Sequence, residues 1–342
     1  MLDDIYFRLL MELAPEESKP NNLDAERIFS HYGETPESRV AFGKLLHAIY
    51  TADPKSDIGL RYGKLLEPHA LCDLSQAVMT AANFSAGLNA VSNLQHMQGS
   101  AYCLSIYQAS SQISIALTFP YKKVVSNVKQ RFSAESGFSY LVNFIRETVN
   151  PSINPKHLYL SYEKPDYAQD YEAFYKCPIT FGAPLSRLEF DSELGAIPLK
   201  TSNPVLFNML MMKCQDIARS AERHWDFDYR TSTNLMLHHP YSFNCDTISR
   251  ILNISPRGLQ KKLSKLGTSF STLSSLARVE LAKVYLVQQD QSLEQVAEKL
   301  GFQTTSGFRR FFKAELGLTA AEFIESESED VNANHHVLEA CH

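Results

Sequence analysis

The chain has 342 residues, of which 44% are hydrophobic and 21% charged, and its 33 Lys and Arg against 38 Asp and Glu give a formal charge of −5. This composition is that of a folded globular protein, which argues against a disordered or fibrous chain, and the length predicts two domains. The apolar stretches at 113–120 and 206–212 fall far short of the roughly 18 to 20 residues that span a membrane, so no membrane partner is expected.

The first residues and the cysteines indicate a reduced, cytoplasmic protein. Acids stand at positions 3 and 4, where a signal peptide would have basic residues. No two of the six cysteines form a CxxC pair, and the smallest gap between neighbours is 31 residues. This spacing predicts free thiols rather than disulfides or structural zinc.

From residue 4 to about 212 the pattern predicts a mixed α/β domain. Helices are expected at 36–51, 70–98, 133–149 and 167–176. Alternating apolar residues predict strands at 102–107 and 112–118, joined by a hairpin turn at 108–111, and shorter strands at 158–162, 178–181 and 188–190. The polar stretch 215–239 is expected to be a connecting helix followed by a linker.

This N-terminal portion carries no recognisable catalytic or metal-binding pattern. His31, His47, His69 and His96 have no Cys or carboxylate at metal-ligand spacing, and GxSxG, GxGxxG and Walker A motifs are absent. No catalytic residue, metal or cofactor is therefore expected. The tyrosine-rich run at 159–175 could line a ligand pocket, but packing in the core is favoured, and no ligand-binding residue is identified.

Residues 244–267 predict two short helices around a tight turn. Asn244 is a candidate N-cap, and Asn253 suits a left-handed turn position. Ser255 caps the second helix, with Pro256 at its first position. Leu259 and Leu263 follow at i, i+4 spacing and are expected to face inward, so basic and amide side chains occupy the other faces.

The same pattern returns 48 residues later. Ser292 takes the place of Asn244 and has Gln295 three residues on, which predicts a capping box. Gly301 matches Asn253, and Phe308 and Phe312 match the two inward leucines. Between the repeats, an apolar stripe in residues 270–289 predicts one amphipathic helix. Two helix-turn-helix units joined by a long helix are therefore expected.

The charge is distributed unevenly along the chain. Residues 1–241 carry a net charge of −4, residues 242–324 carry +4, and the tail from 325 carries five acids and no Lys or Arg. The positive part coincides with the repeated helix-turn-helix. A helix fits the major groove of DNA, where Arg, Lys and Gln can hydrogen-bond base edges, so double-stranded DNA is the expected partner.

These residues resemble the C-terminal DNA-binding domain of AraC/XylS-type transcriptional regulators. The likeness lies in Ile254 to Leu263 and in Val296 to Phe302, continuing through Phe308 to Gly317. It implies that seven residues bind DNA: Arg257, Gln260 and Lys261 sit where the first recognition helix reads its site, and Thr305, Ser306, Arg309 and Arg310 sit where the second does so. The sequence departs from the family in having Asn253 where glycine is usual, and in carrying Gly258 and Gly307 inside the recognition helices.

The N-terminal portion resembles the "arabinose-binding" type of domain found in one subgroup of these regulators. The stretches 174–182, 188–191 and 199–204 carry this weaker likeness, which consists largely of packing residues. We therefore expect an effector-binding or dimerisation domain at 1–214, a linker at 215–239, the DNA-binding domain at 240–325 and an acidic disordered tail at 326–342.

The expected function is that of a bacterial, sequence-specific transcriptional regulator. The resemblance implies contact with RNA polymerase at a promoter, most often as an activator, with a small-molecule effector and a second copy of the chain as further partners. One alternative keeps DNA binding but makes the N-terminal domain a protein-interaction module without a ligand. A remote alternative is a DNA-repair alkyl transferase, which the scattered cysteines disfavour.

Overall fold

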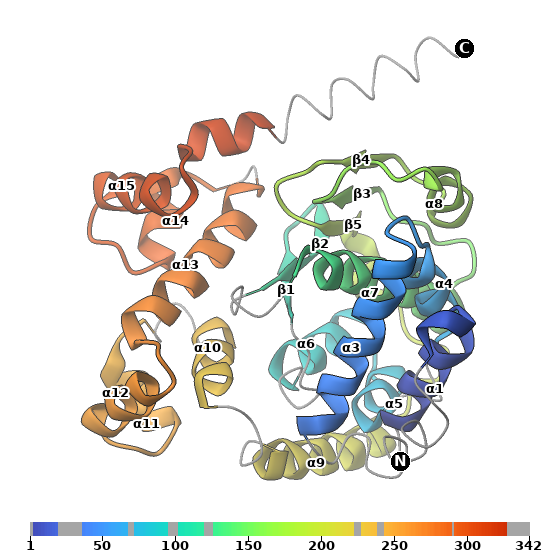
Figure 1. The fold of residues 1–342 in the computed structure, drawn as a ribbon, viewed down its shortest axis with the longest axis horizontal. Helices are drawn as coiled ribbons and strands as arrows, with labels where there is room; N and C mark the ends of the chain where they lie inside the picture. Colours follow the sequence, from blue (N-terminus) through green and yellow to red (C-terminus); the bar gives the residue numbers. More distant parts are fainter. Residues whose placement is uncertain are drawn as a thin grey trace.

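The computed structural model describes residues 3–19, 36–67, 72–94, 102–119, 126–221, 227–237, 243–288 and 291–326. Figure 1 shows a part with sheet and helices formed by the N-terminal residues, beside a smaller, wholly helical C-terminal part. The expected fold class, a mixed α/β domain followed by an all-α domain with two helix-turn-helix units, is confirmed. Within the described residues, no helix is both long and apolar enough to cross a membrane.

One five-stranded sheet organises the N-terminal part. Its strands are β1 (Cys103–Gln108), β2 (Gln112–Thr118), β3 (His157–Leu160), β4 (Ile179–Phe181) and β5 (Arg187–Asp191), in the order β1-β2-β5-β3-β4. All neighbours are antiparallel except β3 and β4. The predicted hairpin is confirmed, since β1 and β2 pair from Cys103 opposite Thr118 to Gln108 opposite Ile113.

Strand β2 is buried on both faces. Ile113, Ile115 and Leu117 point into the N-terminal core. Ala116, on the opposite face, belongs to the core of the C-terminal helices, together with Cys103 of β1. The sheet therefore lies between the N-terminal helices and the C-terminal domain.

The helices of the N-terminal part lie in layers, some packed on the other side of the sheet and others packed on those helices. They are α1 (Asp3–Leu13), α3 (Pro36–Ala52), α4 (Ile58–Leu65), α5 (Asp73–Met79), α6 (Phe84–Leu94), α7 (Asn127–Thr148), α8 (Ala168–Tyr175) and α9 (Pro204–Ala221). Helix α4 was not predicted from the sequence. It packs so closely on α7 that a Cβ added at Gly63 would collide with Ser139 and with the backbone at Ser136.

The single helix predicted at 70–98 is wrong, because two helices, α5 and α6, form there with a break at residues 80–83. The Thr80 hydroxyl donates to the carbonyl of Ala77 at 2.9 Å and ends α5. Asn83 then accepts the backbone N–H of Ala86 at 2.9 Å and pairs with Pro198. Helix α7 also begins earlier than predicted, at the N-cap Ser126.

The C-terminal helices are α10 (Phe227–Leu237), α11 (Cys245–Ile251), α12 (Pro256–Lys265), α13 (Phe270–Leu286), α14 (Leu293–Lys299) and α15 (Thr305–Leu316). Figure 1 places α11 and α12 at one end of α13, and α14 and α15 at the other. Helix α10 lies in the segment where a linker was expected. Its Leu235 and Met236 are buried in the core of the C-terminal helices.

Candidate nucleic-acid interface

Local hydrogen bonds set the geometry of the first helix-turn-helix unit. The Asn244 side chain accepts the backbone N–H of Thr247 at 2.7 Å and begins α11. Asn253 then adopts φ +53°, the left-handed conformation that lets the chain reverse. Ser255 caps α12 by accepting the N–H of Gly258 at 3.1 Å, with Pro256 in the first turn.

The second unit repeats this geometry. The predicted capping box is present, because Ser292 and Gln295 exchange hydrogen bonds of 2.8 and 3.3 Å. Gly301 has φ +76°, which matches Asn253. Thr304 caps α15 by accepting the N–H of Gly307 at 3.1 Å.

Gly258 and Gly307 occupy the same place in the two recognition helices. Each lies three residues after its cap, and an added Cβ would lie 3.1 Å from the Ser255 hydroxyl or 3.2 Å from the Thr304 hydroxyl. The two departures from the family pattern are thus one feature, a glycine that leaves room for the capping side chain. They are in the first turn, where the propensity penalty of glycine is offset by a well-formed cap.

Burial fixes which face of each recognition helix is free. Leu259 and Leu263 of α12, and Phe308 and Phe312 of α15, have no exposed surface. The seven residues predicted to bind DNA fall on the remaining faces. Thr305 is half-buried, and the other six are exposed: Arg257, Gln260, Lys261, Ser306, Arg309 and Arg310.

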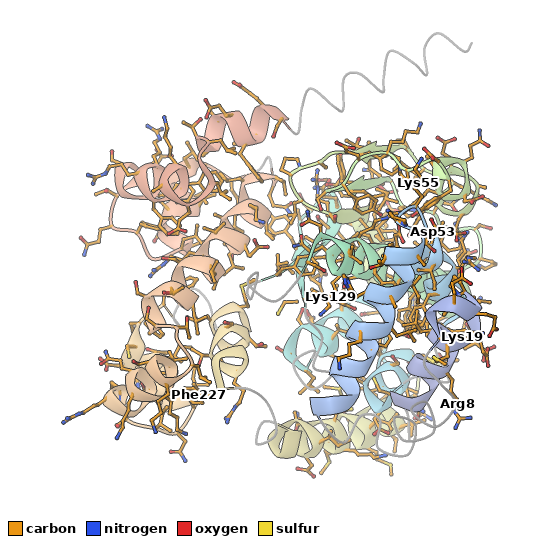
Figure 2. All side chains as sticks on the ribbon, in the orientation of Figure 1. Arg8, Lys19, Asp53, Lys55, Lys129 and Phe227 are labelled. Atoms are coloured by element: carbon orange, nitrogen blue, oxygen red, sulfur yellow. The ribbon has the colours of Figure 1, made fainter. Side chains whose placement is uncertain are left out.

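The exposed face of α15 is positive, but an acid lies nearby. The pKa of the Glu294 carboxyl is held below its usual range, mainly by hydrogen bonds from its own backbone N–H and from Ser292, and also by the positive charge of Arg309. In α12, the Lys262 ammonium makes a cation–π contact with Phe227 of α10, and its Nζ lies 4.9 Å from the ring centre. Figure 2 shows the side chains of these helices extending away from the N-terminal part.

Arg278 of α13 joins the two units, and the sequence did not single it out. Its Nε donates to the carbonyl of Leu300, at the end of α14, at 3.1 Å. Its Nη2 donates to the carbonyl of Phe243, just before α11, at 3.3 Å. The guanidinium also lies over the rings of Phe243 and Phe302, and burial lowers its pKa. The sequence signal that could have identified Arg278 is the presence of a basic residue within the apolar stripe of 270–289.

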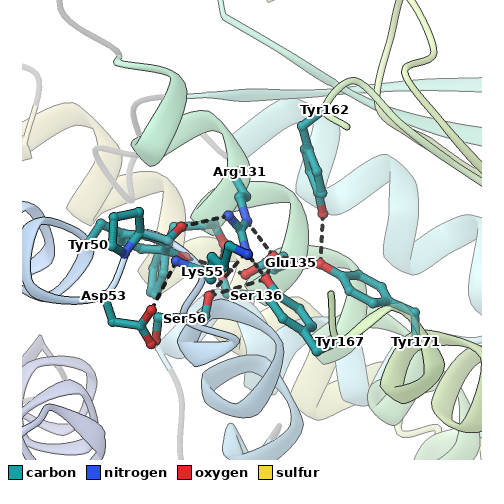
Figure 3. Close-up of polar contacts among 12 residues, drawn as sticks. Tyr50, Asp53, Lys55, Ser56, Arg131, Glu135, Ser136, Tyr162, Tyr167 and Tyr171 are labelled. Atoms are coloured by element: carbon teal, nitrogen blue, oxygen red, sulfur yellow. Dashed lines mark hydrogen bonds and ion pairs between the residues drawn. The ribbon is translucent and has the colours of Figure 1, made fainter. Parts of the chain in front are cut away.

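The tyrosine-rich run of the N-terminal domain surrounds a buried carboxylate (Figure 3). Glu135 of α7 has no exposed surface and accepts the hydroxyls of Tyr167 and Tyr171, each at 2.6 Å, and the Nε of Arg131 at 2.9 Å. Burial and the neighbouring charge of Glu135 raise the pKa of the Tyr167 hydroxyl. This arrangement fits the packing interpretation of the run.

Arg131 extends this cluster to the segment before α4. Its guanidinium donates to the carbonyls of Pro54 and Ser56 at 3.1 and 3.2 Å, and it contacts the Tyr167 hydroxyl. Helices α4, α7 and α8 are therefore tied together through one buried ion pair.

In the part of the chain that the structure describes, no three His, Cys, Asp or Glu side chains gather where a metal ion could bind. His47 is exposed on α3, whereas His31, His69 and His96 lie outside the described residues.

Two family models match the chain. Residues 35–199 match the arabinose-binding domain of AraC transcription regulators, found N-terminally, and residues 248–326 match a helix-turn-helix domain. The chain is 24% identical to the ornithine utilization regulator of Pseudomonas aeruginosa over 327 residues, which cover 94% of this chain and 95% of that protein.

Two further proteins are similar over different lengths. The transcriptional activator RhrA of Rhizobium meliloti is 27% identical over 143 residues, 40% of this chain and 45% of that protein. The crystal structure of the transcriptional regulator CdpR from Pseudomonas aeruginosa aligns with 93% of this chain and 97% of its own, at 18% identity and a TM-score of 0.45.

Proposed function

Because this chain belongs to the AraC/XylS-type DNA-binding transcriptional regulators, in the subgroup with an arabinose-binding-type N-terminal domain, we propose that α12 and α15 read promoter DNA under control of the N-terminal domain. The observation that carries the proposal is the repeated unit: two helices with matching caps and buried faces present basic, amide and hydroxyl side chains outward. Two such helices about 34 Å apart would enter successive major grooves on one side of the duplex.

The seven predicted residues divide between the two helices. Arg257, Gln260 and Lys261 of α12 contact one half of the site, and Thr305, Ser306, Arg309 and Arg310 of α15 contact the other. Arg, Lys and Gln have the donors that pair with base edges, while hydroxyls near a helix N-terminus bind phosphate oxygens. Their exposure on α12 and α15 supports this assignment.

The N-terminal domain is proposed to sense a small molecule and to mediate self-association. Its match to an arabinose-binding-type domain supports the first role but does not identify the sugar as the ligand. The similar Pseudomonas protein is named for ornithine utilization, so ornithine belongs in any effector screen. For self-association, α9 exposes Val205, Met209 and Met212 by 70%, 63% and 68% on one helix face, which a second copy would cover.

The regulator is further proposed to act in the cytoplasm and to contact RNA polymerase at the promoter. The proposed activator role is supported by the name of the similar protein RhrA, a transcriptional activator. We propose an effector-binding and dimerisation domain at 1–214 and a DNA-binding domain at 240–325. Within 215–239, expected as a linker, α10 packs with the C-terminal helices. Of the acidic tail expected at 326–342, residues 327–342 lie outside the described residues. The alternative of a ligand-independent N-terminal domain is tested by the effector experiments described below.

An enzymatic role as an alkyl transferase is disfavoured by the surroundings of three of the six thiols. Burial raises the pKa of Cys103 and of Cys177 to about 12, and that of Cys214 to about 11. Such thiols are protonated at neutral pH and are poor nucleophiles.

DNA binding is tested with the double variant Arg309→Ala/Arg310→Ala, on a promoter fragment selected in vitro from genomic DNA with the full chain. Losing two charge-assisted contacts is expected to weaken binding about 100-fold. The logarithm of affinity should fall with the logarithm of salt concentration with a slope near −5 if about six phosphates are contacted. Lys200→Met, an exposed change in the N-terminal domain, is the control. Unchanged affinity of a folded double variant would contradict the assignment of α15.

A further inference from the structure

A cavity of about 280 Å³ lies where the C-terminal helices meet the sheet. Its walls come from both parts of the chain: Phe119 at the end of β2, Ser161 after β3, Leu185 and Ser186 before β5, and Glu280 and Lys283 of α13. This volume is just below the roughly 300 to 1,000 Å³ that is typical of ligand pockets, so only a small metabolite would fit.

A buried ion pair forms the α13 side of this cavity. The side chains of Glu280 and Lys283 are only 3% and 9% exposed, and the Lys283 Nζ lies 2.5 Å from Oε1 of Glu280. The other oxygen, Oε2, accepts the backbone N–H of Phe119 at 3.0 Å. One carboxylate therefore links the lysine of the DNA-binding domain to the sheet of the N-terminal domain.

The pair constrains the charge of any occupant. The Lys283 ammonium and the Glu280 carboxylate place a cation and an anion side by side, so a ligand with a single charge matches one of them and meets a like charge at the other. A zwitterion matches both: its carboxylate accepts from the Lys283 ammonium, which has three donors, and its ammonium donates to Glu280. Ser161 and Ser186, whose hydroxyls are 2.9 Å apart, offer polar partners to the rest of the molecule.

We propose that this cavity binds a small zwitterion, an α-amino acid or a close derivative, between the two domains. The inference rests on the proposed control of DNA binding by an effector, and it names the site and chemical class of that effector. Because the ligand contacts both α13 and the sheet, it binds the docked arrangement of the domains more tightly than a separated one. By linkage it then changes the affinity of the chain for DNA.

The test uses the full chain. Thermal-shift assays with the twenty protein L-amino acids and ornithine identify the strongest stabiliser, whose dissociation constant is then measured by calorimetry. The methyl ester and the N-acetyl form of that compound each carry a single charge and should bind at least about tenfold more weakly. Equal binding of either form would overturn the proposal, as would the lack of any stabilising compound in the panel.

Two variants locate the site. Lys283→Met removes the ammonium that would bind the carboxylate of the ligand. Ser161→Leu fills the cavity from an exposed position and leaves the ion pair of Glu280 and Lys283 intact. Each should lower ligand affinity by at least about tenfold, whereas Lys200→Met should not. If Lys283→Met fails to fold, Ser161→Leu decides, and full affinity in that variant overturns the site.

DNA binding by the same preparations separates this inference from the proposed function. A chain that binds its promoter fragment but responds to no compound in the panel would overturn the inference alone. A chain that fails to bind DNA at all would overturn the proposed function.

Discussion

Arg278 is the side chain that connects the two helix-turn-helix units. It hydrogen-bonds a carbonyl at the end of α14 and another just before α11, so it fixes the ends of both units to α13. The guanidinium fork can reach both carbonyls at once, which a lysine ammonium on a flexible stem does less well. The relative orientation of the two recognition helices therefore depends on this residue, although it is proposed to touch no DNA.

Replacing Arg278 with Met should lower both stability and DNA affinity. Two partly buried hydrogen bonds to backbone carbonyls are lost, which costs about 1 to 3 kcal/mol of unfolding free energy. Arg278→Lys should recover only part of this loss. Urea unfolding and fluorescence anisotropy on the selected promoter fragment measure the two effects. Arg250→Met, at an exposed arginine of α11, is the matched control, and equal behaviour of Arg278→Met and Arg250→Met would refute the positioning role.

At the scale of elements, the C-terminal domain was predictable because interactions between residues close in sequence determine where its helices begin and end. The caps at Asn244, Ser255 and Ser292 and the left-handed turn at Asn253 are each set by residues within a few positions. The exposed faces of the recognition helices followed from the same periodicity. What the sequence did not supply was the inward-facing Arg278, whose partners are 22 and 35 residues away.

The N-terminal elements were less predictable because distant residues decide them. The break between α5 and α6 is held by the N–H of Asn203, which donates to the carbonyl of Thr80 at 2.9 Å. Helix α4 has two glycines, a poor local signal, and forms against α7 through close packing at Gly63. The burial of α10 depends likewise on α13, which follows it in the chain.

Helix α9 carries an element-scale prediction about self-association. Its exposed face with Val205, Met209 and Met212 is an apolar surface that a second copy could bury. Met209→Glu/Met212→Glu should shift the chain toward monomer in analytical ultracentrifugation, because two carboxylates would have to be buried at the interface. The control is Asn208→Glu/Gln215→Glu, which adds the same charge at exposed polar positions of α9. A dimer that withstands the first change but dissociates with the second would place the interface elsewhere.

At the scale of the whole molecule, the formal charge of −5 is the sum of regions of opposite sign. The segment 242–324 carries +4, while both flanking regions are negative. Non-specific attraction to DNA depends on the field of the whole chain at low salt, when screening is weak. Specific contacts depend on a few side chains of α12 and α15. The acidic regions should therefore lower non-specific binding more than specific binding, and so increase selectivity.

Neutralising the acids after Ser326, without changing the length of the chain, tests whether the acidic tail increases selectivity. The variant Glu327→Gln/Glu329→Gln/Asp330→Asn/Glu339→Gln removes four negative charges. Affinity for random-sequence duplex DNA should rise by about three- to tenfold at low salt, because less repulsion opposes the phosphates, and the gain should vanish at high salt. Affinity for the promoter fragment should rise less. A variant with the same tail residues in scrambled order keeps the charge and should behave like the natural chain. Equal gains on both DNAs would mean that the tail weakens all binding alike and gives no selectivity.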